Sequence, residues 1–297
     1  MRKVSFAEFG GPDVLRIVDA EEPHAGPGEV RIAVRAAGVN PVDWRLREGQ
    51  VLGAHPVELP SGVGLDAAGV VDEVGEGVDG VEAGDRVFGE GADTYAEFAV
   101  LSAWARMPEG LTFEEAAGYP SVVETALRVL REVGVRPGET LLVSGASGGV
   151  GSAVLQIARD RGIRVIGTAG PANQDYLRGL GALATTYDQG WPERVRQLGR
   201  VDAALDLAGS GVIRELVELT GDPGRVLTIA DLGAPGLGVR FSGAAGSMPD
   251  ALAAAVDLIS RGRLHIPVER SYPLDEAATA HIDSQAGHTR GRRVLVV

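Results

Sequence analysis

The sequence contains no cysteine, few aromatic residues and no long uncharged hydrophobic run. Of the 297 residues none is Cys, and only 5% are Phe, Trp or Tyr. The absence of cysteine excludes disulfide bonds and zinc sites built on thiolates. No uncharged apolar run reaches about 18 residues, so no segment is expected to cross a bilayer. Residues 1–10 also lack the apolar core of a signal peptide, and we therefore expect a cytoplasmic protein.

Basic residues and histidine are scarce as well. The chain has 28 Lys and Arg against 41 Asp and Glu, which gives a net charge of −13. This acidic balance argues against binding to nucleic acid or to an anionic membrane surface. Only five His are present, and no two of them have the i, i+4 spacing of a helical metal site. With 44% hydrophobic and 23% charged residues, the composition is that of a globular protein, and the length allows two domains.

The hydrophobic pattern changes near Pro108. Before it, short alternating segments at 30–35, 69–74 and 85–88 are separated by turns, which is typical of a small β-barrel. After it, helical stretches cover 112–133, and strands then alternate with helices. The strands are expected at 140–144, 164–167, 201–207 and 225–229, and the helices at 150–161, 175–180, 213–219 and 252–259. This order predicts an α/β domain with a doubly wound parallel sheet, and a last strand at 293–297 that returns to the first domain.

A glycine-rich turn at 144–151 carries the strongest chemical signal. It reads SGASGGVG, follows a buried strand directly and opens a helix. Glycine permits a tight turn and close approach of a pyrophosphate, and the helix N-terminus supplies free N–H donors and partial positive charge. We therefore expect the backbone of this turn to bind a dinucleotide. The residues assigned to it are Gly145, Ala146, Ser147, Gly148, Gly149 and Val150, with Gly151 completing the pattern.

The end of the second expected strand indicates which dinucleotide binds. An NAD site needs an acidic residue there to hold the ribose 2′-hydroxyl, but residues 167–171 read GTAGP. Without that carboxylate nothing repels a 2′-phosphate, so the sequence predicts NADP(H). No Arg or Lys is adjacent, and hydroxyl and amide groups of Thr168, Asn173 and Tyr187 are expected to serve instead.

Several motifs in a fixed order resemble those of one protein family. They are AGVNPVDWR at 37–45, GLDAAGVV at 64–71, the glycine turn, GTA at 167–169, LGA at 180–182 and GRRVL at 291–295. Together they resemble the medium-chain dehydrogenase/reductase superfamily, in its zinc-independent quinone oxidoreductase (ζ-crystallin-like) branch. The resemblance implies a GroES-like β-barrel catalytic domain at 1–115, completed by about 262–297. It also implies a Rossmann NADP-binding domain at 116–261.

The resemblance also implies roles for residues around the nicotinamide. Zinc-dependent relatives place Cys and His where Asn40 and Leu65 stand, so no metal is expected. Asn40 and Asp43 match positions beneath the nicotinamide. For Asp43 the alternative, which we favour over proton transfer, is structural support of a tight turn by hydrogen bonds to the backbone. Trp44 and Arg45 match positions near the substrate, and core packing is the alternative for Trp44.

Further expectations concern the cofactor. Thr125 matches a nicotinamide contact, with a helix N-cap or first-turn hydroxyl as the alternative, and Glu124 before it replaces an apolar residue common in relatives. Tyr187 matches a residue that reaches the 2′-phosphate side. Ala208 and Ala230, at the ends of later strands, should face the cofactor. Arg290 and Arg292 form a basic cluster, which is either an exposed, solvated pair or a phosphate contact.

These inferences predict an NADPH-dependent enzyme that reduces a quinone or an α,β-unsaturated carbonyl without zinc. One alternative is an enoyl reductase of a biosynthetic pathway. Another is an NADPH-binding protein with a structural or regulatory role and little turnover. The resemblance further implies a homodimer joined through Rossmann edge strands, near residues 239–242.

Overall fold

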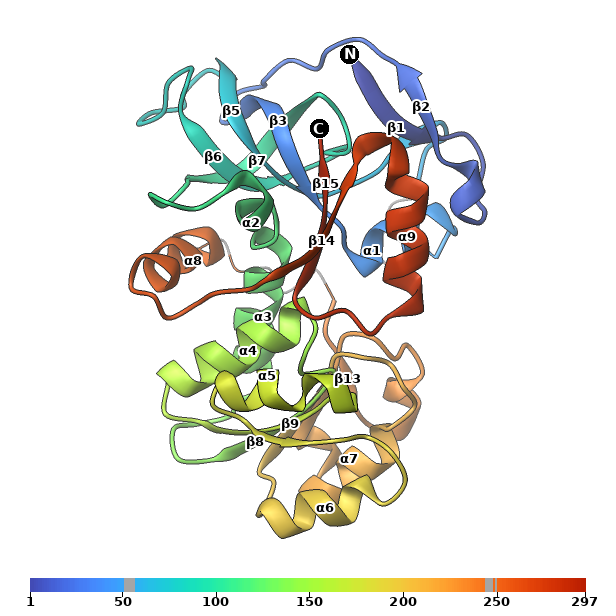
Figure 1. Cartoon of the computed structure of the whole chain (residues 1–297), viewed down its shortest axis with the longest axis vertical. Coiled ribbons are helices and arrows are strands. Elements are labelled where there is room, and N and C mark those ends of the chain that lie inside the picture. The colour runs from blue at the N-terminus through green and yellow to red at the C-terminus, as the bar shows by residue number, and fades with distance from the viewer. Residues whose placement is uncertain (51–56, 244–247, 249) are drawn as a thin grey trace. The chain divides into compact units, whose positions relative to one another are not determined.

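The computed structural model describes residues 1–50, 57–243, 248 and 250–297. These residues form two compact units. Unit 1 comprises Met1–Ser121, Pro249–Gly262 and Ile266–Val297, and unit 2 comprises Val122–Met248 and Arg263–His265. Figure 1 shows both units and labels many of their elements.

Unit 1 is built mainly from β-strands. Its strands are β1 (Arg2–Phe6), β2 (Arg16–Asp19), β3 (Val30–Gly38), β4 (Ser61–Gly62), β5 (Asp66–Val74), β6 (Arg86–Gly91), β7 (Phe98–Arg106), β14 (Val268–Pro273) and β15 (Arg292–Val296). Its helices are α1 (Pro41–Arg47), α2 (Phe113–Ala117), α8 (Ala251–Ser260) and α9 (Ala277–Ala286), with 3₁₀ turns at Pro12–Val14 and Leu274–Glu276.

The main sheet of unit 1 closes on itself as a barrel. The strand order is β14-β15-β3-β5-β6-β7, and β3 also pairs with β7. Alternate residues of β3 contribute to the barrel core: Val30, Ile32 and Val34 are all buried, as expected when every second side chain of a strand faces inward. The C-terminal strand β15 pairs antiparallel with β3, with Leu295 opposite Ala37, so the return of the last strand to the first domain was predicted correctly.

Helix α8 belongs to unit 1, where it packs against β7. The domain boundaries predicted from the sequence place residues 252–259 in the second domain instead. The helix predicted at 252–259 is therefore present, but its apolar residues belong to unit 1.

Unit 2 is an α/β unit whose sheet is parallel throughout. Its strands are β8 (Thr140–Ser144), β9 (Arg164–Thr168), β10 (Leu183–Thr185), β11 (Ala203–Asp206), β12 (Val226–Thr228) and β13 (Arg240–Phe241). Its helices are α4 (Gly149–Asp160), α5 (Gln174–Gly179), α6 (Trp191–Leu198) and α7 (Ile213–Thr220), with 3₁₀ turns at Pro171–Asn173, Pro223–Arg225 and Ala234–Leu237. Helix α3 (Pro120–Val133) begins at the end of unit 1 and runs into unit 2.

The strand order of unit 2 is β10-β9-β8-β11-β12-β13. The order reverses between β8 and β11, which is the point where open parallel sheets bind ligands. All five residues of β8 are buried, as expected for a central strand covered on both faces. Trp191 and Val195 of α6 and Ile213 and Leu216 of α7 join the strand residue Leu142 in one buried apolar cluster. The predicted doubly wound sheet is confirmed.

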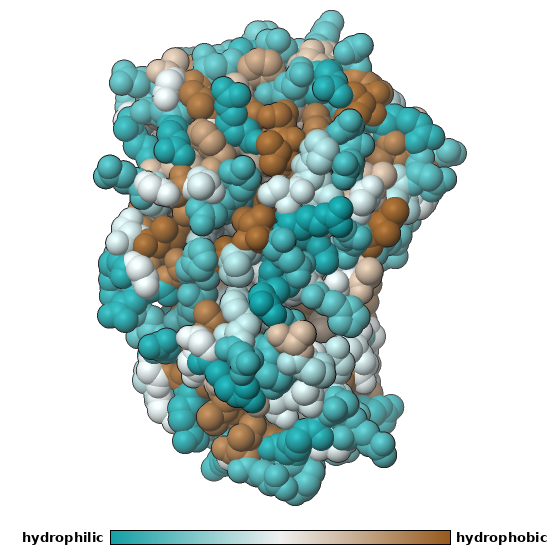
Figure 2. Space-filling model, viewed as in Figure 1, coloured by the Kyte–Doolittle hydropathy of each residue, from teal (hydrophilic) through white to brown (hydrophobic). Residues whose placement is uncertain are grey.

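On the face drawn in Figure 2, hydrophobic residues form small separate patches among hydrophilic ones. Within the described part of the chain, no helix has the length and apolarity needed to traverse a bilayer.

Candidate functional site

The glycine turn links β8 to α4 at the point where the strand order reverses. Gly145 has a φ of +80°, and Gly148 is extended and precedes the first residue of α4. A Cβ at Gly151 would lie 2.4 Å from the Gly145 carbonyl oxygen. Side chains are therefore excluded at 145 by the backbone angle and at 151 by close packing.

This turn has the properties of an anion cradle. The first N–H groups of α4 have no intrahelical acceptor, and the helix dipole places partial positive charge beside them. A Cβ at Gly148 would meet only the Gly145 carbonyl oxygen, 3.7 Å away, so the backbone is accessible there. A pyrophosphate fits this combination of free donors and exposed backbone.

Small residues lie beside the turn at the ends of the neighbouring strands. A Cβ at Gly145 would be 3.1 Å from Ala208, and one at Gly209 would be 3.0 Å from Ala230. The structure thus places Ala208 and Ala230 along the edge where the sequence predicted them.

A buried pair of side chains holds this edge in shape. Asp206 accepts hydrogen bonds from the backbone N–H groups of Ala208 (3.2 Å) and Gly209 (3.0 Å). The Thr228 hydroxyl donates to Asp206 Oδ2 at 2.8 Å and accepts from the N–H of Ala230 at 3.0 Å. Sequence reasoning missed both residues, because an acid or a threonine at a strand end carries no pattern of its own.

The three residues predicted to face the 2′-phosphate gather near the end of β9. Thr168 is buried at the end of that strand. Asn173 donates from Nδ2 to Ser147 Oγ at 3.2 Å, which connects it to the glycine turn. The side chain of Tyr187 is half exposed, and its hydroxyl lies 3.5 Å from where a Cβ of Gly170 would stand.

Thr125 and Glu124 lie within α3 and form part of a polar cluster. Thr125 is the sixth residue of the helix, so the alternative of an N-cap or first-turn hydroxyl is wrong. Arg128 donates from Nε to Glu124 Oε1 at 2.9 Å, from Nη2 to Thr125 Oγ1 at 3.3 Å and from Nη1 to Ser242 Oγ. Glu124 therefore provides the counter-charge for a guanidinium that is almost wholly buried.

In unit 1, Asn40 and Asp43 make the turn that starts α1. The backbone N–H of Asn40 donates to Asp43 Oδ2 at 2.7 Å, and the Tyr95 hydroxyl donates to the same oxygen at 2.9 Å. Burial raises the pKa of Asp43 to about 7, although the two hydrogen bonds oppose the rise. These contacts are those of a carboxyl that supports a turn.

Asp66 is the centre of a second buried group next to the first. Its carboxylate accepts hydrogen bonds from Asn40 Nδ2 at 2.9 Å, from the Ser121 backbone N–H at 3.0 Å and from the Ser121 hydroxyl. Burial raises the pKa of Asp66, and the charge of Arg292, whose Nη2 lies 3.3 Å from Oδ2, opposes this. Neither Asp66 nor Tyr95 was identified from the sequence, since their partners are remote along the chain.

Arg292 corrects one interpretation of the basic cluster near the C-terminus. Arg290 is exposed, but Arg292 is buried and paired with Asp66, so the two do not form an exposed, solvated pair. Gly38 makes this arrangement possible, because a Cβ there would stand 2.8 Å from Arg292 Nη2 and 2.9 Å from Asp66 Cβ.

Trp44 and Arg45, the predicted substrate residues, are neighbours in α1. The guanidinium carbon of Arg45 lies 5.3 Å from the centroid of the Trp44 ring, a cation–π distance. Burial lowers the pKa of Arg45. Trp44 Nε1 is buried and has no hydrogen-bond partner among the described residues.

Comparison with known proteins agrees with this architecture. Residues 26–117 match the alcohol dehydrogenase GroES-like domain family, and residues 180–295 match the zinc-binding dehydrogenase family. A quinone oxidoreductase from Pseudomonas aeruginosa is 31% identical, with 99% of each chain covered. The crystal structure of Escherichia coli quinone oxidoreductase complexed with NADPH superposes with a TM-score of 0.87 at 26% identity, covering 100% of both chains.

A component of a larger enzyme is also similar. The pikromycin polyketide synthase component PikAII of Streptomyces venezuelae is 38% identical over 94% of this chain, which spans 8% of that protein's length. The full-length matches and the two family domains lead to one conclusion. The chain belongs to the medium-chain dehydrogenase/reductase superfamily, in its quinone oxidoreductase branch.

Proposed function

We propose that this protein is an NADPH-dependent reductase that delivers hydride to a quinone or another α,β-unsaturated carbonyl. The observation that carries the proposal is the glycine cradle at the reversal point of the unit 2 sheet. Relatives named quinone oxidoreductases, one of them solved with NADPH, support it. The test is NADPH oxidation by the purified protein with a panel of quinones and a panel of enones.

Residues of unit 2 would bind and orient the cofactor. The amides of residues 145–150 would hold the pyrophosphate, and Thr168, Asn173 and Tyr187 would offer neutral donors to the 2′-phosphate. Ala208 and Ala230 leave room along the strand ends, and Thr125 would contact the nicotinamide. When bound, NADPH supplies the hydride, and the protein contributes orientation and exclusion of water.

Residues of unit 1 would line the acceptor side. We propose that Asn40, held by Asp66, presents its remaining amide atoms to substrate or ribose, and that Asp43 supports the turn. Trp44 and Arg45 offer a planar, cationic surface to an aromatic acceptor. We also retain Arg290 and Arg292 as proposed cofactor contacts, which the pairing of Arg292 with Asp66 makes the least supported of the set.

We propose that hydride transfer proceeds without zinc. Asn40, in the position of a cysteine ligand, already donates its amide to Asp66, and Leu65 has no ligating atom. The described residues contain no group of three His, Cys, Asp or Glu suited to a metal ion. Treatment with a chelator should leave the rate of NADPH oxidation unchanged, and its loss would reject the zinc-free mechanism.

An enoyl reductase is the second candidate, favoured by the 38% identity to part of a polyketide synthase component. An α,β-unsaturated thioester in the acceptor panel separates the two, because only an enoyl reductase should prefer it to quinones. Tight NADPH binding without turnover of any acceptor would favour the third possibility, a binding protein with a structural or regulatory role.

We also propose that the protein forms a homodimer through the sheet of unit 2. Strand β13 ends the strand order and leaves one side unpaired among the described strands. Sedimentation velocity should give twice the mass of the 30.8 kDa chain, and a monomer would contradict the proposal.

A further inference from the structure

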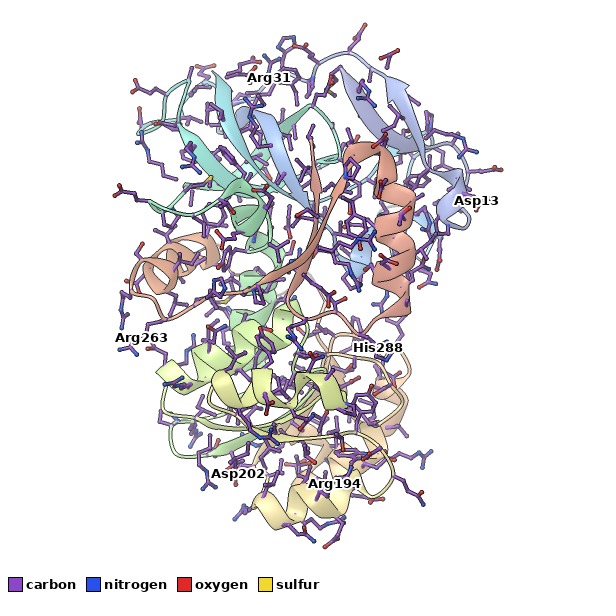
Figure 3. The ribbon with its side chains drawn as sticks, in the orientation of Figure 1. Asp13, Arg31, Arg194, Asp202, Arg263 and His288 are labelled. Carbon is purple, nitrogen blue, oxygen red and sulfur yellow. The ribbon has the colours of Figure 1, made fainter. Side chains whose placement is uncertain are left out.

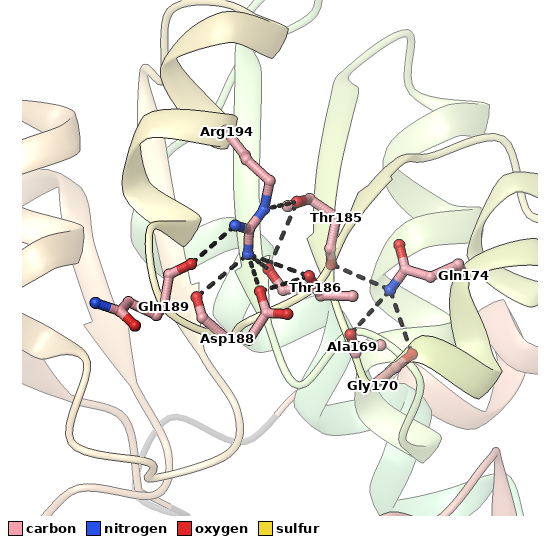
Figure 4. A network of polar contacts seen from close by, with 8 residues as sticks. All are labelled: Ala169, Gly170, Gln174, Thr185, Thr186, Asp188, Gln189 and Arg194. Carbon is pink, nitrogen blue, oxygen red and sulfur yellow. Dashed lines mark hydrogen bonds and ion pairs between the residues drawn. The ribbon is translucent and has the colours of Figure 1, made fainter.

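Arg194 forms several hydrogen bonds to the loop that carries Tyr187. The loop runs from the end of β10 to the start of α6, the helix that carries Arg194 (labelled in Figure 3). Nε donates to Thr185 Oγ1 at 3.2 Å, and Nη1 donates to the Gln189 carbonyl at 2.9 Å. Nη2 donates to the Thr186 carbonyl and hydroxyl at 3.2 and 3.1 Å and to the Asp188 carbonyl at 3.2 Å, and it pairs with the Asp188 carboxylate (Figure 4).

Every nitrogen of this guanidinium is therefore engaged within the loop. Asp188 is held in turn by the Thr186 hydroxyl, which donates to Oδ1 at 2.8 Å. This hydrogen bond, followed by the charge of Arg194, lowers the pKa of Asp188. Asp188 is therefore charged at neutral pH, and its charge and that of Arg194 cancel locally.

Tyr187 lies in the sequence between two members of this network, Thr186 and Asp188. The residues on either side of it both bind Arg194, whereas its own hydroxyl lies against Gly170 at the end of β9. Gln174 ties the two segments together, because its Nε2 donates to the carbonyls of Ala169 at 2.8 Å and Thr185 at 3.2 Å. Arg194 therefore holds the residues on both sides of Tyr187.

We propose that Arg194 is a positioning residue for NADPH affinity, which acts by holding Tyr187 over the end of β9 and does not itself bind the 2′-phosphate. This inference rests on the proposed function, because it requires the adenosine end of NADPH to lie at that strand end. It gives a role to an arginine that the 2′-phosphate prediction did not use.

The test is a double-mutant cycle on equilibrium NADPH binding, followed by cofactor fluorescence. Arg194→Ala should raise the Kd for NADPH about tenfold, the loss expected when a contact residue is no longer held in place. In a Tyr187→Ala background the same change should have almost no further effect, because Arg194 acts through Tyr187. Asp188→Asn should remain close to wild type, since the Asn carbonyl still accepts from Arg194.

Arg196→Ala is the matched control, because it removes an arginine from an exposed ion pair with Glu193 on the same helix. It should leave the Kd unchanged, and thermal melting should confirm that all variants remain folded. Additive effects of Arg194→Ala and Tyr187→Ala, or no effect of Arg194→Ala, would overturn the inference. Failure of the wild-type protein to bind NADPH would instead reject the proposed function.

Discussion

At the scale of single residues, burial decides the protonation of Asp43. Its pKa of about 7 means that the folded protein keeps a proton that the unfolded chain, with a pKa near 3.8, has already lost. At pH values between these two pKa values, the folded state binds more protons than the unfolded state. The free energy of unfolding therefore falls as pH rises. Above about pH 7 this loss is complete and the contribution becomes constant.

The substitution Asp43→Asn tests this linkage. Asn mimics the protonated carboxyl and keeps an acceptor for Asn40 and Tyr95. Relative to wild type, the variant should therefore gain stability as pH rises from about 5 to 7, by up to about 1.4 kcal/mol per unit. Urea denaturation at several pH values measures it, with the exposed Asp175→Asn as control. Parallel curves for Asp43→Asn and wild type would contradict the assignment.

Gly151 gives a second prediction at this scale. A Cβ there would press against the Gly145 carbonyl, so Gly151→Ala should destabilise the protein by about 1–3 kcal/mol and weaken NADPH binding. Gly179→Ala is the control, since a Cβ at that helical position meets nothing within 4 Å. The control should be neutral or slightly stabilising in thermal melting. Equal effects of the two changes would show that the turn tolerates side chains.

At the scale of elements, α3 depends on the pair formed by Glu124 and Arg128. Their side chains are only 16% and 6% exposed, and Arg128 also reaches Ser242 beyond β13. Glu124→Ala would leave a buried, uncompensated charge, and we expect a loss of about 3 kcal/mol in the free energy of unfolding.

The double variant Glu124→Leu/Arg128→Met should recover most of that stability, because two apolar residues remove both buried charges. The exposed pair of Asp257 and Arg261 on α8 has the same i, i+4 spacing and serves as control. Asp257→Ala should cost less than about 0.5 kcal/mol. A Glu124→Ala variant as stable as this control would show that Arg128 is not truly buried.

The helices and strands differ in how well the sequence predicted them. Long or uniformly apolar segments such as β8 and α4 have patterns set by their own residues, and they were predicted within about a residue or two. Strand β10 was missed, because three residues cannot display a period. Strand β13 was expected only through the family resemblance, as an edge strand near residues 239–242. Helix α1 was also missed, since its seven residues were considered only as part of a motif.

Some residues of the candidate site could be predicted from the sequence, and others could not. The glycine turn was predictable because tight turns and close packing require glycine wherever they occur. The environment of Asp43 was not, because its partner Tyr95 is 52 residues away and no local pattern links them. Arg292 could not be recognised as buried, since a charged residue near other charges is usually exposed.

At the scale of the whole molecule, unit 1 contains a closed barrel, and unit 2 contains a parallel sheet with a glycine turn at its reversal point. Both units are formed by segments remote in sequence, with β15 completing the barrel of unit 1. The central claim is that unit 2 binds NADPH through that turn, with the added phosphate held by neutral donors.

Fluorescence titration of the purified protein with NADPH and NADH tests this claim most directly. We predict saturable binding of NADPH, much tighter than that of NADH, and a marked loss of NADPH affinity in Gly151→Ala. Absence of NADPH binding, or equal affinity for the two cofactors, would contradict it.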